Sequence, residues 1–485
     1  MNKEIIRNVF INIFAQVITL VIGFILPPLI ITTYGSAQNG MVASIAQFIA
    51  YLSVVEAGIG AASIAALTKP LYNNDKNQIN SIIAATQNFY SKAGSIFAFM
   101  ILLLAFIYPH IVEYVDKFSA CFMVLVLSIG GILDFFVIGK YRVLLIADRK
   151  NYIMVIFRII NIILSAVVSI ILIENGNSLL LVKFTSVLIY VSGYAMIFVY
   201  VKKHYCFINL KTKFDKNTLE QKWDVMCHRV SGMVLDNSPL VLLTIFCSLS
   251  EVSIYSIYSM IFLAIDKLID TLSDGMQGFF GRFLAENNPN KMKKIYEKYE
   301  TVYFLIIGIC YTCALILTIP FMQIYARNMT DANYIQPTLV VLFVAVGIMN
   351  KLRQPAIMLY VSAGHFKQTK WQAIAEAVIN ISASIFFVIK FGFTGVLLGS
   401  VCSLAYRTLD IIIYSSKNVV HNSLLITFTK VIVLGIWYYI GYFILYGYMA
   451  YNINSYLDFV KNAGTSFVFL AIPTLIYLFY IKKVR

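Results

Sequence analysis

Long apolar stretches separated by short polar breaks follow one another from residue 9 to the end of the chain. A helix needs about 20 predominantly apolar residues to cross the roughly 30 Å hydrocarbon core of a bilayer. The pattern predicts about fourteen such spans and an all-α polytopic membrane protein. The spans are Val9–Thr33, Val42–Leu67, Ala93–Tyr108, Ala120–Ile138, Tyr152–Ile173, Leu179–Val201, Val225–Leu249, Val252–Phe280, Val302–Ile319, Thr338–Ser362, Trp371–Ile389, Gly392–Tyr414, Val431–Tyr448 and Ala463–Ile481. The third is short, and the eighth and tenth are long and contain charges.

Composition supports the membrane class independently of the spans. Hydrophobic residues make up 60% of the chain and charged residues 13%, and the mean hydropathy is +0.80. A soluble domain carries about 25% charged residues, because it must cover its surface with groups that water solvates. Water is therefore not the main solvent of this chain.

Basic residues predict the orientation of the spans. Lysine and arginine in short loops collect on the cytoplasmic side of a membrane. With the N-terminus inside, the inner segments hold 28 of them, and the outer loops hold only Lys117, Arg327, Lys390 and Lys461. Both termini are therefore expected in the cytoplasm, with no cleaved signal peptide. The net charge of +15 is then explained by contact with anionic inner-leaflet lipid, and no nucleic-acid partner is expected.

A polar segment and a short repeat predict the domain organisation. Residues 202–224 separate an N-terminal six-helix lobe, 1–201, from a C-terminal six-helix lobe, 225–414, and residues 415–485 add two helices and a cytoplasmic tail. The motif Asn161 to Ser165 with Gly176 recurs as Asn380 to Ser384 with Gly395. Its two copies fall on the fifth and eleventh spans, which favours a duplicated bundle with a central cleft between its lobes.

Motifs for enzyme chemistry are absent from the sequence. There is no phosphate-binding loop, nucleophile elbow or dinucleotide fingerprint, and the five histidines have no metal-ligand spacing. Cys310 and Cys313 lie in an apolar helix without nearby basic residues, so packing explains them better than redox chemistry. We expect no catalytic residues, no metal and no cofactor.

Ionisable residues inside spans are candidate functional groups, because hydrocarbon tolerates them only beside a cavity or a partner. The candidate cations are Arg158, Lys351, Arg353 and Arg407. The candidate acids, for ion coupling or as polar groups of the cleft, are Glu56, Asp134, Asp236, Asp266, Asp270, Glu376 and Asp410. For some intramembrane charges a structural role explains the position as well as a functional role does. Lys183 lies near a span end, and Asp266, Lys267 and Asp270 have the spacing of pairs on a helix surface.

The cations favour an anionic ligand. Arg353 precedes Gln354 and Pro355, where the proline removes a backbone donor and opens the helix. Guanidinium groups match phosphate oxygens in a bidentate geometry, and this attraction strengthens away from water. We therefore predict a central cleft lined by Arg158, Arg353 and Arg407.

The order of several weak motifs resembles one known family. The motifs are Gly35 to Gly40 leading into Gln47, Tyr51, Leu52 and Glu56 to Gly58; Glu251 to Tyr255; Tyr325 with Asp331 to Tyr334; Arg353 to Pro355; Ala363 to Lys367 with Thr369; and Gly395 with Gly399. In order and spacing they resemble the polysaccharide transporter branch of the multidrug/oligosaccharidyl-lipid/polysaccharide exporter superfamily, the O-antigen and capsule repeat-unit flippases. The resemblance covers nearly the whole chain.

The resemblance implies a fold and a function. It implies a V-shaped pair of six-helix lobes with two further helices, in the bacterial plasma membrane. The implied activity is movement of an undecaprenyl-diphosphate-linked oligosaccharide from the inner to the outer leaflet, by alternating access. Membrane lipids, a polysaccharide polymerase and export machinery are the implied partners.

Three other functions stay open. A multidrug antiporter of the superfamily would need a carboxylate in the early helices, where the first span has only Asn12 and Gln16 and the nearest acid is Glu56. Lipid II flippases typically have a basic residue in the first helix, and the first span has none. A glycosyltransferase or polymerase would need a long outer loop with acid/base groups, and the longest here is Phe321–Gln336.

Overall fold

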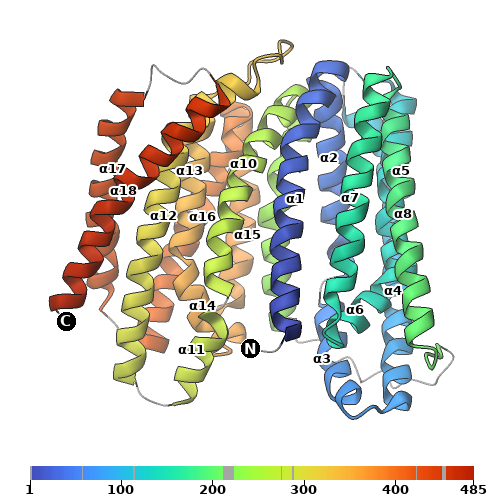
Figure 1. The fold of residues 1–485 in the computed structure, drawn as a ribbon, viewed down its shortest axis with the longest axis horizontal. Helices are drawn as coiled ribbons and strands as arrows, with labels where there is room; N and C mark the ends of the chain where they lie inside the picture. Colours follow the sequence, from blue (N-terminus) through green and yellow to red (C-terminus); the bar gives the residue numbers. More distant parts are fainter. Residues whose placement is uncertain are drawn as a thin grey trace. The chain divides into compact units, whose positions relative to one another are not determined.

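A computed structural model of the protein describes residues 3–56, 58–112, 115–210, 223–274, 276–286, 289–421, 423–449 and 455–484. All regular secondary structure in these ranges is helical (Figure 1). Twelve of the described helical stretches are long and apolar enough to cross a membrane. The prediction of an all-α polytopic membrane protein is therefore confirmed. The other two predicted spans, the seventh and the fourteenth, fall on helices α9 (Trp223–Phe246) and α18 (Tyr456–Val484).

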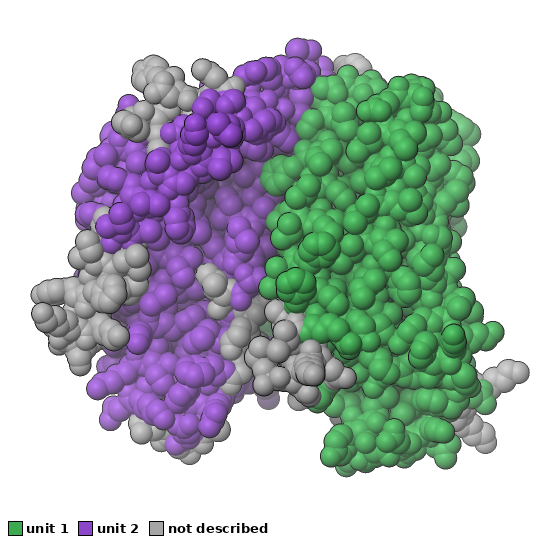
Figure 2. All heavy atoms as spheres, in the orientation of Figure 1, with its two compact units in different colours: residues 1–253 green, residues 254–485 purple. Residues whose placement is uncertain are grey.

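Contacts divide the chain into two compact units, coloured separately in Figure 2: unit 1, Met1–Ser253, and unit 2, Ile254–Arg485. Unit 1 contains α1 (Lys3–Tyr34), α2 (Ser36–Leu52), η1 (Ser53–Glu56), α3 (Ile59–Tyr72), α4 (Lys76–Ile111), α5 (Lys117–Leu133), η2 (Asp134–Ile138), α6 (Gly139–Ala147), α7 (Asn151–Glu174), α8 (Leu179–His204) and α9. Helix α10 (Leu249–Asp274) begins in unit 1 and continues in unit 2. Unit 2 further contains α11 (Met276–Ala285), α12 (Pro289–Tyr325), α13 (Pro337–Leu352), α14 (Gln354–Ser362), α15 (Phe366–Phe391), α16 (Thr394–Ser415), η4 (Ser416–Val420), α17 (Leu424–Met449) and α18.

Helix α9 packs along α2 within unit 1. The hydroxyl of Thr244 donates to that of Ser44 at 2.7 Å, and the Asn39 amide donates to Ser253 at 2.8 Å. Gly40 lets the backbones approach, because a Cβ there would lie 1.8 Å from a carbonyl oxygen of α10. The two units are defined by contacts within the chain and carry no information about a duplication. The lobe boundaries predicted at residues 201 and 225 therefore stay a prediction.

The second predicted span, Val42–Leu67, is wrong as one continuous helix. Helix α2 ends at Leu52, the 3-10 turn η1 follows, and α3 begins at Ile59. The break contains Gly58 at φ 90°, a left-handed conformation that strongly favours glycine. An apolar run alone does not reveal such a break, because its residues remain apolar on both sides.

The third predicted span, Ala93–Tyr108, is too short. Helix α4 runs for 36 residues, because its polar first half belongs to the same helix. The Asp75 carboxylate accepts from the Gln78 amide at 3.0 Å and caps this helix. Asp116 caps α5 in the same way, and its hydrogen bond from the Ser119 backbone amide lowers the pKa of the Asp116 carboxyl.

The internal repeat has a physical basis in helix pairing. Its first copy lies on α7, which packs on α8, and its second lies on α15, which packs on α16. Buried Asn161 lies against Gly193 of α8, whereas buried Asn380 donates to Ser400 at 3.3 Å and to Ser403 at 3.1 Å of α16. In both copies the asparagine therefore joins its helix to the next one.

Candidate functional site

The structure sorts most of the predicted intramembrane charges into three clusters. The unit-1 triad is Glu56, Asp134 and Arg142. The lysine cluster, in unit 2, is Asp266, Asp270 and Lys351. The arginine cluster, also in unit 2, is Arg353, Glu376, Arg407 and Asp410.

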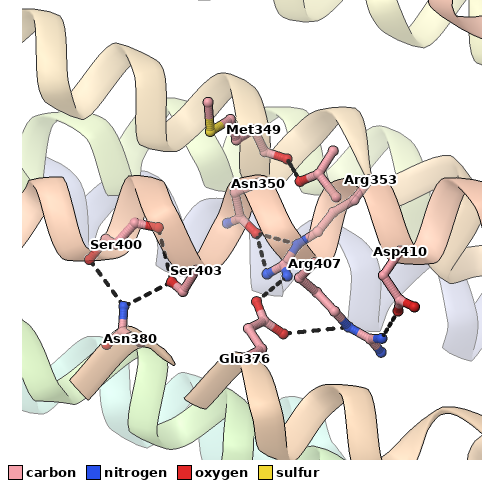
Figure 3. A network of polar contacts seen from close by, with 10 residues as sticks. Met349, Asn350, Arg353, Glu376, Asn380, Ser400, Ser403, Arg407 and Asp410 are labelled. Atoms are coloured by element: carbon pink, nitrogen blue, oxygen red, sulfur yellow. Dashed lines mark hydrogen bonds and ion pairs between the residues drawn. The ribbon is translucent and has the colours of Figure 1, made fainter. Parts of the chain in front are cut away.

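The arginine cluster joins the α13–α14 break to α15 and α16 (Figure 3). Glu376 lies between the two guanidinium groups: Arg353 Nη1 donates to its Oε1, and Arg407 Nε lies 3.5 Å from its Oε2. Arg407 Nη1 also donates to Asp410 Oδ2 at 2.5 Å, one turn further along α16. The side chains of Glu376 and Arg407 are each 5% exposed, that of Arg353 12% and that of Asp410 24%. The cluster is therefore buried at Glu376 and more open at Asp410.

A break in the helix positions Arg353. Helix α13 ends at Leu352, and α14 begins at Gln354 with Pro355 in its first turn. The sequence predicted this interruption from the proline, and the prediction is confirmed. The Asn350 side-chain oxygen accepts from Arg353 Nη2 at 2.8 Å and from Nε at 3.2 Å, which fixes the guanidinium plane.

The lysine cluster joins three helices of unit 2. Lys351 Nζ on α13 donates to Asp270 Oδ1 at 2.7 Å and lies 3.5 Å from Asp266 Oδ1, both on α10. Tyr311 on α12 donates to Asp266. Gly347 makes room for this tyrosine, because a Cβ there would lie 2.2 Å from its ring. Asp266 and Asp270 therefore make their main contacts with other helices. The alternative explanation, that they pair with Lys267 on the surface of their own helix, does not account for these contacts.

The unit-1 triad has the same construction. Arg142 on α6 lies between Asp134, with Nη1 to Oδ2 at 2.6 Å, and Glu56. Tyr90 on α4 donates to Glu56 Oε1 at 2.7 Å. A Cβ at Gly139 would lie 2.6 Å from the Tyr90 ring, so this glycine gives the tyrosine room as Gly347 does in unit 2. Each unit thus repeats one arrangement: a cation close after a glycine, two carboxylates, and a tyrosine that donates to one of them.

Arg142 was not among the candidates predicted from the sequence. It was expected in an inner loop after the fourth span, whereas α5, η2 and α6 continue the helical path to Ala147. The spacing along the chain could have indicated this pair, because Arg142 follows Asp134 by about two helical turns and would lie on the same face of one helix. Lys140 was placed in the same loop and is buried on α6.

A second missed cluster connects α12 to α17. The buried Glu300 carboxylate accepts from Lys430 Nζ at 2.7 Å and from Thr427 Oγ1 at 3.0 Å. Both Glu300 and Lys430 lie beyond the apolar runs, so the sequence placed them in loops. The helices extend past those runs, and the pair fastens α17 to the bundle of unit 2.

Two candidates of unit 1 lie outside the clusters. Arg158 is an exposed residue of α7, and among the described residues no carboxylate forms a salt bridge with it. Asp236 is an exposed residue of α9 whose backbone carbonyl lies 3.5 Å from the Gln47 amide. Arg158 belongs to unit 1 while Arg353 and Arg407 belong to unit 2, so the cleft they were predicted to share stays a prediction.

The balance of charges within the arginine cluster limits its ability to bind an anion. Arg353 and Arg407 are matched by Glu376 and Asp410, so the arginine cluster is formally neutral. Removal of one partner from a buried pair of this kind leaves a costly unpaired charge. An anion can therefore use these guanidinium groups only if a carboxylate gives way.

Comparison with known proteins gives the fold. No protein-family model matches the chain, and no curated protein does. Lipid II flippase MurJ in an inward closed conformation matches with a TM-score of 0.72 at 14% identity, over 99% of this chain and 100% of that one. An inward-facing multidrug resistance MATE family transporter of the MOP superfamily matches with a TM-score of 0.64 at 13% identity, over 86% of this chain and 98% of that one. The MATE multidrug transporter DinF-BH matches with a TM-score of 0.57 at 14% identity, over 86% of this chain and 94% of that one.

The chain shares its fold with these three solved proteins. Together with its apolar helices, this fold makes it a multi-pass membrane protein. The identities of 13% and 14% carry the comparison no further than the fold.

Proposed function

We propose that the protein is a flippase that moves a polyprenyl-diphosphate-linked oligosaccharide, a surface-polysaccharide repeat unit, from the inner to the outer leaflet. The observation that carries this proposal is the extent of the fold match. The lipid II flippase covers 99% of this chain, whereas each of the two drug exporters covers 86%. A fold shared along its whole length with a carrier of a lipid-linked substrate supports a substrate of that class.

The arginine cluster supports an anionic headgroup. The unit-1 triad and the lysine cluster repeat one arrangement, which a duplication of the fold would explain. The arginine cluster departs from that repeat: it joins α15 to α16, whereas no described salt bridge of unit 1 joins α7 to α8. Arginine pairs match the oxygens of a diphosphate.

Transport would proceed by alternating access of two pseudo-symmetric lobes, without ATP hydrolysis by this chain. The site would open first to the inner and then to the outer leaflet of a bacterial plasma membrane, with both chain termini cytoplasmic. The polymerase that joins repeat units and the export machinery beyond it would take up the product.

A lipid II flippase is the second candidate, favoured by the fold match itself. The observed α1 is longer than predicted and contains Lys3 and Arg7. Arg7 stacks on Tyr152, with 3.7 Å from its guanidinium carbon to the ring centre, and precedes the apolar stretch Phe10–Tyr34. That apolar stretch contains no basic residue, which favours the oligosaccharide carrier.

Deletion of the gene in its native host should separate these functions. We expect the deletion strain to lose a surface polysaccharide, to accumulate its lipid-linked repeat unit and to keep its drug resistance. When the first sugar transfer of that polysaccharide is also blocked, we expect normal viability. Extracted lipid-linked sugars, quantified by mass spectrometry, are the measurement. Accumulation of lipid II with cell lysis would instead indicate the peptidoglycan precursor, and drug sensitivity alone would indicate an exporter of drugs.

A further inference from the structure

Glu376 occupies the position in which an anion would contact both arginines. Its two carboxylate oxygens face different guanidinium groups, Oε1 toward Arg353 and Oε2 toward Arg407 (Figure 3). A phosphate group placed between these arginines would present its oxygens to the same donors. The buried carboxylate therefore has the place and the charge sign of a ligand.

The surroundings of Glu376 hold the arginines independently of it. Arg353 keeps two hydrogen bonds to Asn350, and Arg407 keeps its bond of 2.5 Å to Asp410. Thr408 on α16 donates to the carbonyl of Met349 at 3.0 Å, which joins α16 to α13 beside the cluster. Each guanidinium thus has a second partner that would keep it in place while Glu376 moved.

We propose that Glu376 is an internal counter-ion that occupies the anion site of the empty carrier and exchanges with the diphosphate of the substrate. This inference rests on the proposed function. Arg353 and Arg407 bind the Glu376 carboxylate when no substrate is present and bind phosphate oxygens when it arrives. Asp410 stays with Arg407 during the exchange and is the most exposed member of the cluster.

Exchange solves an electrostatic problem of any carrier for anions. Without an anion at the position of Glu376, the like charges of Arg353 and Arg407 would repel each other, and only the Asp410 carboxylate would remain to balance them. An empty carrier must nevertheless return through its conformational cycle. A carboxylate on the neighbouring helix α15 neutralises the site for that return, and it competes with the substrate and so promotes release.

If the role of Glu376 is purely structural, the expected change in affinity for the anion has the opposite sign. If Glu376 only holds α15 to the break at Arg353, its neutralisation loosens the site and weakens anion binding. If Glu376 competes with the anion, its neutralisation strengthens anion binding. Loss of a brace does not produce a gain in affinity, so the sign of the change separates the two.

The test compares wild-type protein with Glu376→Gln in lipid nanodiscs, with undecaprenyl diphosphate as the probe and undecaprenol as the reference. We expect Glu376→Gln to bind undecaprenyl diphosphate at least tenfold more tightly than wild type and to export more slowly, because release is impaired. Glu300→Gln is the matched control, since Glu300 is another buried, paired glutamate of unit 2, and its affinity should equal that of wild type. Glu376→Asp, whose shorter carboxylate reaches the arginines less well, should bind with intermediate affinity and serves if the glutamine variant does not fold.

Each outcome bears on one claim or on both. Equal or weaker binding by Glu376→Gln, with wild type preferring the diphosphate over undecaprenol, overturns the exchange and leaves the proposed function intact. Binding by Glu376→Gln but not by wild type supports the exchange in its strongest form. A failure of wild type and every variant to prefer the diphosphate overturns both the exchange and the proposed headgroup.

Discussion

Replacement of both arginines of the arginine cluster, Arg353→Ala with Arg407→Ala, is expected to abolish export of the lipid-linked oligosaccharide. One charge-assisted hydrogen bond contributes about 1.5 to 3 kcal/mol, or roughly 10- to 150-fold in affinity, and the pair should exceed either alone. Lysine at both positions keeps the charge but loses the planar fork, so it should restore export only in part. The measurement is surface polysaccharide in the deleted host, at matched protein abundance.

The double alanine variant also leaves Glu376 and Asp410 without their cations, so its folding needs a control. A variant in which both arginines become methionine, Glu376 becomes methionine and Asp410 becomes asparagine removes the whole set of charges, and it should recover stability. It should still fail to export. Normal export by the double alanine variant would end the assignment of these arginines to the diphosphate, and a multidrug exporter would instead depend most on Glu56.

Replacement of Arg142 by alanine is expected to destabilise unit 1 more than any other single change in the unit-1 triad. It would leave Glu56 and Asp134 as unpaired neighbours of like charge. Removal of one partner from a buried pair costs roughly 3 to 5 kcal/mol, and the lower end applies here because the three side chains are 18% to 30% exposed. Thermal unfolding of the purified protein should show a lower midpoint for Arg142→Ala and a smaller loss for Arg142→Lys.

The matching control removes all three charges of that triad. Arg142→Met combined with Glu56→Gln and Asp134→Asn should recover most of the lost stability, since no charge is left unpaired. If the single alanine variant unfolds at the wild-type temperature, the triad does not stabilise unit 1.

The features that could be predicted from the sequence are those that depend on residues close together along the chain. The spans followed from apolar length, and the interruption at Arg353 followed from Pro355. The repeat around Asn161 and Asn380 was visible as a motif, and the structure places its two copies on α7 and α15. These features depend on neighbouring residues along the chain, so a sequence displays them directly.

Pairing between helices could not be predicted in the same way. The sequence showed Arg353 and Arg407 as cations and Glu376 as a separate acid, but it did not show that one carboxylate lies between both guanidinium groups. Arg142 and Glu300 were missed because charged helix ends look like loops when spans are read by hydropathy. A hydropathy profile does not record which helices meet, and charges in a membrane protein are interpretable only with their partners.

The central claim is transport of a diphosphate-linked oligosaccharide between leaflets, and a reconstituted assay measures that movement directly. Purified protein is inserted into liposomes that contain the undecaprenyl-diphosphate-linked repeat unit of the host, and a membrane-impermeant glycosidase is added outside. With wild-type protein we expect the outer-leaflet fraction of the sugar to be replenished until nearly all of it is cleaved, whereas the double alanine variant should stop at the fraction initially outside. Cleavage that stops at that same fraction with wild-type protein, while lipid II placed in the same liposomes does cross, would contradict the account.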